Sequence, residues 1–155
     1  MRLEYFEMVD SVDEFDAERG HLRITSRVPT ESPVFEGHFP TYPILPGVML
    51  LEIMNHASGY LHMARNGVTR LPLFTAVKKA KFRKFISPGT VLEATADLLH
   101  DGSGFGVTNA AIHFEGKSIA EAEITMTLVK FPTEELAAEV RRRAERAGLG
   151  HMASA

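Results

Sequence analysis

One long apolar stretch in the first half of the chain constrains the fold more than any other feature. From Pro46-Gly47 to about Ala64 the chain reads GVMLLEIMNHASGYLHMA after the proline. Good helix formers fill this stretch, and Asn66-Gly67 supplies a stop signal. The most apolar run, residues 43–54, is interrupted by Glu52 and is shorter than the roughly 20 residues that cross a bilayer. The sequence therefore predicts one long helix enclosed within the protein and no membrane span.

Extended segments are predicted on both sides of this helix. Before it, residues 5–15 alternate weakly, and HLRITSRVP places Leu22, Ile24 and Val28 on one face of a strand. After it, turn-forming residues separate four candidates, which we interpret as an antiparallel meander. One face of the last candidate is apolar, so we expect the long helix to cover that side of the sheet. The four candidates are LFTAVKKAKFRKFI, TVLEATADLL, FGVTNAAIHFE and KSIAEAEITMTLVK.

The other segments complete a single domain. Residues 29–46 contain five prolines, which disfavour a long helix or a central strand, so we expect an ordered loop. Residues 133–148 begin with helix-start signals and end in glycine, which predicts a short exposed helix. Residues 151–155 are expected to fray. The prediction is an α+β domain over residues 1–150, with an antiparallel sheet wrapped around one central helix and an extra C-terminal helix.

Composition excludes several classes of function. The chain of 155 residues carries 17 basic and 20 acidic residues, so no overall positive charge favours nucleic acid. It has no cysteine, which excludes disulfides, thiolate nucleophiles and cysteine-based zinc sites and fits a cytoplasmic location. The acidic start lacks the pattern of a secretory signal, so we expect the mature chain to begin at or near Met1.

A polar stripe on the long helix is the first candidate for chemistry. Glu52, Asn55, His56 and Gly59 follow the spacing of one helix face on an otherwise apolar helix. A buried carboxylate is usually paired, protonated or functional. Two interpretations are open at this point: His56 serves only as the structural partner of Glu52, or the stripe belongs to a site.

The proline-rich loop adds a histidine that favours the second interpretation. His38 lies between Gly37 and Phe39-Pro40, where the backbone is restricted and can aim the imidazole at the helix. The string GHFPTYPILPGVMLLEIMNHASG, with 14 positions from His38 to Glu52, resembles the signature of the β-hydroxyacyl-acyl carrier protein dehydratases of fatty-acid synthesis. That family has the hotdog fold, and the resemblance extends over about residues 32–129.

The resemblance implies a mechanism and an assembly. His38 would be the base that removes the α-proton of a (3R)-hydroxyacyl thioester, and Glu52 the acid that assists departure of the β-hydroxyl group, which yields a trans-2-enoyl thioester. The Gly47 amide would stabilise negative charge on the thioester oxygen. The partner would be an acyl carrier protein, with no cofactor or metal. The family shares each site between two subunits, so we expect a homodimer, with a trimer of dimers as an open possibility.

Further contacts are assigned around these residues. Oxyanion or substrate contacts are assigned to Gly47, Phe39, Pro46 and His56. Family members commonly carry glutamine where this chain has His56, and the protonation state of this histidine is not determined by sequence. Two alternatives remain: a hotdog acyl thioesterase, and a non-catalytic acyl-binding hotdog subunit whose acid has been detuned.

A basic cluster follows the helix. Strand alternation would place Lys79, Lys81 and Arg83 on one face, with Ala80 and Phe82 on the other. Such a face is either simply solvated or a docking surface for an acidic carrier protein or its phosphate. Arg141, Arg142 and Arg143 are interpreted mainly as solubilising residues of the C-terminal helix, with carrier docking as a secondary interpretation.

Overall fold

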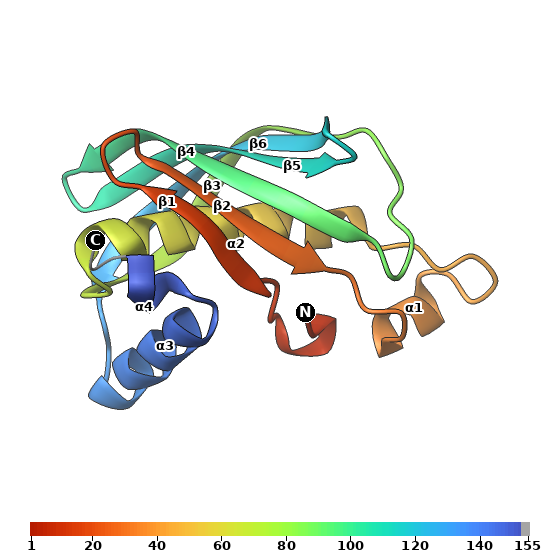
Figure 1. Cartoon of the computed structure of the whole chain (residues 1–155), viewed down its shortest axis with the longest axis horizontal. Coiled ribbons are helices and arrows are strands. Elements are labelled where there is room, and N and C mark those ends of the chain that lie inside the picture. The colour runs from red at the N-terminus through yellow and green to blue at the C-terminus, as the bar shows by residue number, and fades with distance from the viewer. Residues whose placement is uncertain (153–155) are drawn as a thin grey trace.

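The computed structural model describes residues 1–152. One antiparallel sheet of six strands, in the order β1-β2-β4-β5-β6-β3, curves around the long helix α2 (Gly47–Asn66) (Figure 1). This is the predicted hotdog architecture. The strands are β1 (Ser11–Asp16), β2 (His21–Arg27), β3 (Arg70–Phe82), β4 (Val91–Gly102), β5 (Phe105–Phe114) and β6 (Lys117–Lys130). The other elements are η1 (Leu3–Tyr5), α1 (Pro33–Gly37), α3 (Glu134–Arg146) and α4 (Leu149–Met152).

Helix α2 begins and ends where the sequence predicts. Pro46 precedes its first residue, and Gly67 ends it at a positive φ of 63°, a conformation that glycine adopts readily. The N–H group of Gly67 donates to carbonyls at the end of the helix. No helix within residues 1–152 is long and apolar enough to span a membrane.

The inner face of the sheet packs on α2 through alternating side chains. Ala120, Ala122, Ile124 and Met126 of β6 are at most 3% exposed, while the intervening residues are more exposed. Leu22 and Ile24 of β2 are fully buried in the same way. Removal of this apolar surface from water is the main stabilising contribution to the fold. The predicted covered face is therefore confirmed.

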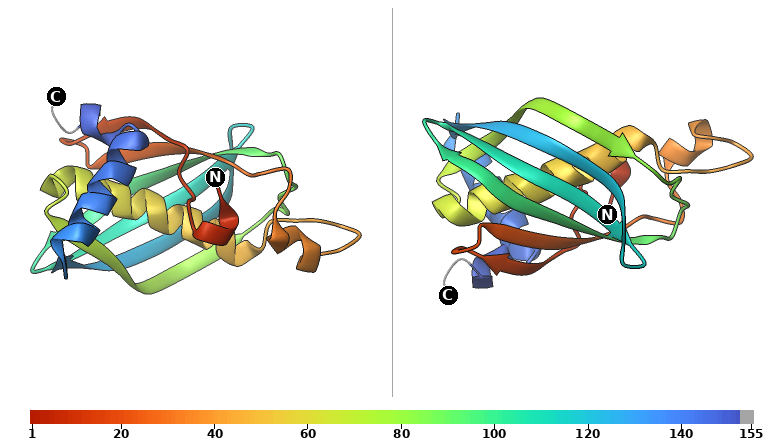
Figure 2. Two further views of the ribbon diagram at one scale, coloured as in Figure 1. Left: turned by 90° about the horizontal axis from the view of Figure 1, so that it is seen from below. Right: turned by 90° about the horizontal axis from the view of Figure 1, so that it is seen from above.

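Two strand predictions were wrong. Strand β3 pairs with β6, from Arg70 opposite Lys130 to Phe82 opposite Ala120, so only β4, β5 and β6 form a meander. The connection after β3 does not turn back as a hairpin but crosses the end of the sheet to reach β4 (Figure 2). Of residues 5–15, Tyr5 ends the short helical turn η1, and β1 begins only at Ser11.

The proline-rich segment is an ordered loop that contains the short helix α1. The Ser32 hydroxyl caps α1 by accepting from the Val34 N–H group at 3.2 Å. The Leu45 N–H group donates to the Ile86 carbonyl at 2.7 Å, which ties the loop to the connection after β3. The loop extends past one end of the sheet, next to the start of α2 (Figure 1).

The C-terminal helix α3 lies on the side of α2 that the sheet leaves open. Seen from below, it crosses the C-terminal half of α2 (Figure 2, left). Its N-cap is Thr133, whose hydroxyl accepts from the Leu136 N–H group at 3.2 Å. Of the segment predicted to fray, residues 153–155 lie outside the described residues.

Candidate active site

His38 is held in one tautomer by its own loop. Its Nδ1 atom lies 3.2 Å from the Ile44 carbonyl oxygen. A carbonyl oxygen can only accept, so Nδ1 carries the hydrogen and Nε2 of the neutral ring keeps its lone pair. The ring stacks on Phe39 at 4.2 Å between centroids. The loop thus presents His38 with a basic nitrogen directed away from its anchor.

Glu52 lies on α2 with both carboxyl oxygens in contact with neighbours on the same helix. The Asn55 side-chain amide donates to Oε2 at 3.1 Å, and His56 Nε2 lies 3.0 Å from Oε1. The predicted contact between Glu52 and His56 is confirmed. The geometry accommodates a His56 N–H group that donates to an ionised carboxylate, or a protonated carboxyl group that donates to His56. Glu52 is 27% exposed, so its carboxyl group remains accessible.

The first turn of α2 exposes the amide of Gly47. The first N–H groups of a helix have no acceptor within the helix, and they carry the positive end of its dipole. Pro46, the N-cap residue, makes no side-chain capping bond. A Cβ atom on Gly47 would approach only Phe82 Cγ, at 4.0 Å, so the space beside this Cα atom is open, and the residue is exposed. The turn is suited to bind a polarised carbonyl oxygen.

Within one chain, His38 and Glu52 have separate partners. His38 is anchored to Ile44, whereas Glu52 is held by Asn55 and His56. Among residues 1–152, no group of three or more His, Asp or Glu side chains is placed to hold a metal ion. A buried histidine, His62, lies about three turns beyond Glu52 on α2 and is described below.

Two adjoining pockets follow α2 beyond Glu52. We call them the polar pocket, of ≈ 260 Å³, and the apolar pocket, of ≈ 190 Å³. His56, Tyr60 and Arg143 line both. Burial raises the pKa of Tyr60, against the opposing charges of Arg143 and Arg146, so its hydroxyl group is neutral at pH 7.

Sequence reasoning missed two parts of this region. Arg143 was interpreted as a solubilising residue, but α3 places it over α2, where it lines both pockets. The hydrogen-bond partner of His38 is the main-chain carbonyl of Ile44, and every residue type has such a carbonyl, so the sequence does not identify it. Of the apolar residues near the helix, Ile53 is fully buried in the core, whereas Tyr60 borders the pockets and Phe39 is 48% exposed.

The basic cluster differs from its prediction. The register shifts between Lys78 and Lys81, and Lys79 has a φ of 55°, so simple alternation does not hold. Arg83 lies beyond the end of β3. Acidic residues of β6 also pair with the cluster: Glu121 lies 2.7 Å from Arg83 and 3.8 Å from Lys81. The positive charge of this surface is therefore partly neutralised.

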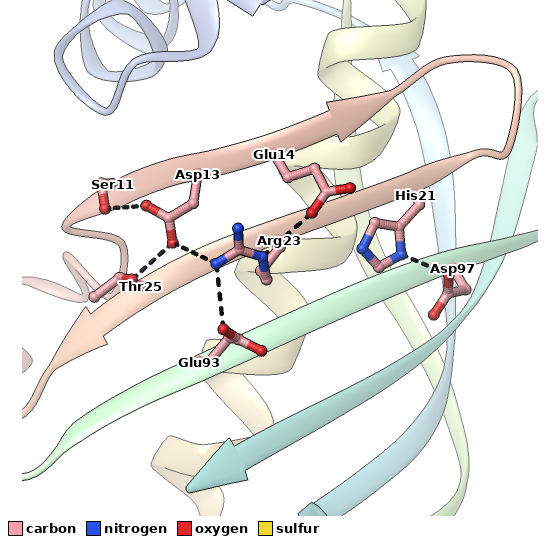
Figure 3. Close-up of polar contacts among 8 residues, drawn as sticks. All are labelled: Ser11, Asp13, Glu14, His21, Arg23, Thr25, Glu93 and Asp97. Atoms are coloured by element: carbon pink, nitrogen blue, oxygen red, sulfur yellow. Dashed lines mark hydrogen bonds and ion pairs between the residues drawn. The ribbon is translucent and has the colours of Figure 1, made fainter. Parts of the chain in front are cut away.

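A second charged cluster lies on the outer face of the sheet. Arg23 on β2 approaches Asp13 at 3.6 Å, Glu14 at 3.4 Å and Glu93 at 3.2 Å, and thereby joins β1, β2 and β4 (Figure 3). Next to it, His21 Nδ1 lies 2.7 Å from Asp97. These groups satisfy one another on the face that points away from α2, which indicates that they stabilise the sheet edge.

His62 is buried without a polar partner. The side chain is 1% exposed, and neither ring nitrogen has a hydrogen-bond partner among the described residues. The ring lies directly against Gly106 of β5, where a Cβ atom would come within 2.0 Å of it. Burial lowers the pKa of His62, with Asp101 acting in the opposite direction and Arg65 in the same one.

Comparison with known proteins identifies the family. Residues 2–123 match the FabA-like domain. The 3-hydroxyacyl-[acyl-carrier-protein] dehydratase FabZ of Protochlamydia amoebophila is 37% identical over 124 residues, which cover 80% of each protein. FabZ of Chlamydia pneumoniae is 35% identical over 127 residues, or 80% of this chain and 83% of the relative.

Solved structures agree on the fold. The conserved protein PA5202 from Pseudomonas aeruginosa superposes with a TM-score of 0.62 at 17% identity, over 81% of this chain and 91% of that protein. The PaaI protein of E. coli gives a TM-score of 0.60 at 20% identity, over 77% and 78%. At such identities the likeness concerns the fold alone. The match over residues 2–123, together with relatives above 30% identity, shows that this chain belongs to the family of FabA-like domain proteins.

Proposed function

We propose that the protein is a dehydratase that converts a (3R)-hydroxyacyl group on acyl carrier protein to a trans-2-enoyl group. The observation that carries the proposal is the 37% identity to a FabZ dehydratase across 80% of both chains. The local geometry supports it, because a histidine with a free Nε2 atom, a held carboxyl group and an open helix N-terminus are the groups that such an elimination needs.

The reaction divides between the two side chains. His38 Nε2 takes the proton from C2 of the hydroxyacyl group, and the electron pair of that bond forms the C2–C3 double bond. Glu52 donates a proton to the C3 hydroxyl group, which leaves as water. The Gly47 amide lies at the N-terminus of α2, where it can stabilise negative charge on the thioester oxygen while C2 is being deprotonated. Phe39 and Pro46 flank these groups as substrate contacts.

A homodimer is part of the proposal, and strand β3 supports it. This strand is one of the two edges of the sheet, and every residue from Phe74 to Phe82 is exposed. A long edge with unpaired main-chain groups and apolar side chains is a template for pairing with a second strand. Its exposed apolar side chains are Leu73, Phe74, Val77 and Phe82. Pairing of two such edges in a dimer would allow His38 of one subunit and Glu52 of the other to lie in the same active site.

The central experiment uses purified protein and 3-hydroxyacyl carrier substrates. Mass spectrometry follows dehydration and the reverse hydration, and a thiol reagent follows hydrolysis. We expect enoyl product without free thiol, and a large loss of rate in His38→Ala and Glu52→Gln. Released thiol would instead indicate a thioesterase. Retained acyl binding without turnover would indicate a non-catalytic subunit, and undiminished dehydration in either variant would remove that residue from the mechanism.

Carrier docking on Lys79, Lys81 and Arg83 is a further part of the proposal, together with a cytoplasmic location. An acidic carrier protein would compete with Glu121 for these cations. We expect Lys79→Glu with Arg83→Glu to raise KM for carrier-linked substrate and to leave KM for the same acyl group on pantetheine unchanged. Equal KM values for wild type and variant with the carrier would contradict the docking surface.

A further inference from the structure

The two pockets continue from the proposed acid along α2. His56 contacts Glu52 directly and lines both pockets, and Tyr60, one turn further, also lines both. At 1.5 Å per residue, the backbone of Tyr60 lies about 12 Å along the helix axis from that of Glu52. A chain whose C3 atom reaches Glu52 can therefore extend past His56 towards Tyr60.

The apolar pocket has the lining that an alkyl chain needs. It lies between α2, β3, β6 and α3, and Met63, Pro72, Met126 and Val140 are among its walls. Gly59 adds room, because a Cβ atom there would stand 3.6 Å from Pro72 and 3.7 Å from Met126. Apolar surfaces of this kind favour methylene groups over water.

The adjoining polar pocket holds an excess of positive charge. Arg2, Arg143 and Arg146 line it, together with Glu7 and Asp10. Both acidic groups are already ion-paired: Glu7 lies 3.8 Å from Arg2, and Asp10 pairs with the amino terminus of Met1. Neither carboxylate therefore pairs with Arg143 or Arg146 there.

The arginines of α3 share a single carboxylate. Glu139 lies 2.7 Å from Arg142, 3.1 Å from Arg143 and 3.8 Å from Arg146. Hydrogen bonds from Arg142 and Arg143 lower the pKa of Glu139, so it stays ionised, but it neutralises only one of these three cations. Two guanidinium groups beside the neutral hydroxyl of Tyr60 are a suitable set of donors for a carboxylate.

We propose that these pockets bind the far end of the acyl chain and that this end carries a carboxylate. The inference rests on the proposed dehydratase function, and it narrows the substrate class to 3-hydroxyacyl thioesters of dicarboxylic acids. The alkyl part would fill the apolar pocket, and the terminal carboxylate would enter the polar pocket beside Tyr60, Arg143 and Arg146.

The test compares substrates that differ only at the tail. Three series of 3-hydroxyacyl pantetheine thioesters, over a range of chain lengths, end in methyl, hydroxyl or carboxylate. At the best length, we expect kcat/KM to be about tenfold or more higher for carboxylate than for methyl, the fold-change typical of one hydrogen bond between charged groups. Arg143→Gln should remove most of this preference, and Arg143→Lys should keep part of it.

Arg142→Gln is the matched control, because Arg142 lies on the same helix and pairs with the same Glu139 but lines neither pocket. This variant should keep the wild-type preference. Equal kcat/KM for methyl and carboxylate tails, or a preference that Arg143→Gln leaves intact, would overturn the inference while the dehydratase function stands.

A binding measurement separates the two proposals. Amide-linked analogues with the same tails are titrated into Glu52→Gln protein with and without Arg143→Gln. Tail-dependent affinity that is lost in the double variant, combined with no turnover of any substrate by wild type, would support the pocket and overturn the dehydratase. Affinity that does not depend on the tail would count against the pocket.

Discussion

Both oxygens of the Glu52 carboxyl group are held by side chains of its own helix. Asn55 and His56 bind from one turn away, so the carboxyl group is oriented before any substrate arrives. Such preorganisation reduces the reorganisation that a proton transfer would otherwise need. His56 acts through Glu52, which makes it a positioning residue in the proposed mechanism.

Replacement of His56 tests this role. We expect His56→Leu to lower kcat by about tenfold, because the hydrogen bond that orients the Glu52 carboxyl group is lost, with a smaller effect on KM. His56→Gln can still donate to Glu52 and should retain most of the rate. Steady-state kinetics of both variants provides the measurement, and equal loss in the two would argue against a hydrogen-bonding role.

His62 is a buried base whose neutral form the fold requires. Its pKa is lowered in the folded protein, whereas an unfolded chain protonates histidine near pH 6.5. Below that pH the unfolded state binds more protons than the folded state, so stability falls as the pH decreases. Above it, both states carry a neutral ring and this dependence disappears.

We therefore expect the free energy of unfolding to decrease between pH 7.5 and 5.5 more steeply in wild type than in His62→Phe. Urea unfolding at a series of pH values measures it. His100→Phe is the control, since it removes an exposed histidine. Parallel curves for wild type and His62→Phe would show that His62 does not contribute.

At the scale of elements, β5 packs tightly against α2 where Gly106 meets His62. The missing Cβ atom lets the strand lie against the ring. Nearby, the Thr108 hydroxyl of β5 donates to the Ser58 hydroxyl of α2 at 2.7 Å, so one steric contact and one buried hydrogen bond lie along the same seam. At Gly106 the seam therefore has no room for a side chain.

Gly106→Ala should destabilise the protein by roughly 1–3 kcal/mol, because the added methyl group overlaps the buried ring. His62→Ala in the same chain should relieve part of the loss, and a double-mutant cycle from denaturant unfolding measures the coupling. Gly37→Ala serves as control, since a Cβ atom there meets no atom within 4 Å. Strictly additive effects would contradict the overlap.

The sequence predicted those helices and strands whose boundaries or buried faces depend only on their own residues. The stop at Asn66-Gly67 defines the end of α2, and alternation in β6 identifies its buried face. The pairing of β3 with β6 was not predictable in the same way, since 40 or more residues separate many of the partners and either edge would satisfy the alternation. The bulge near Lys79 likewise depends on the neighbouring strand.

Contacts within one helix of the candidate site were predicted from the sequence, whereas contacts between helices were not. The contact between Glu52 and His56 follows from helical spacing, because residues four apart are neighbours on a helix. The place of Arg143 does not follow from spacing, since it depends on how α3 docks across α2. Sequence reasoning also passed over His62, because a histidine on a mostly apolar helix gives no sign of whether it finds a partner.

For the whole molecule, strand β3 leaves one edge of the sheet unpaired. We expect Phe74→Asp with Val77→Asp to give a folded monomer, because carboxylates on this edge oppose its pairing with a second copy. If the site is shared, activity should fall by roughly a hundredfold or more. Light scattering gives the mass, circular dichroism the fold, and the dehydration assay the rate.

Leu99→Asp is the control for this pair, because Leu99 is an exposed apolar residue of β4, away from the β3 edge. It should leave the mass and the rate unchanged. A wild-type protein that is monomeric and active would rule out the shared site.

Helix α3 follows the last strand and lies outside residues 2–123, the part of the chain that matches the family. The groups proposed for bond breaking precede it, and Arg143, which we assign to the tail of the substrate, belongs to it. In this proposal, the residues that perform the reaction and the residue that selects the acyl chain lie in separate segments of the sequence. Changes in the last thirty or so residues could redirect the enzyme to other acyl chains while its chemical step is inherited intact.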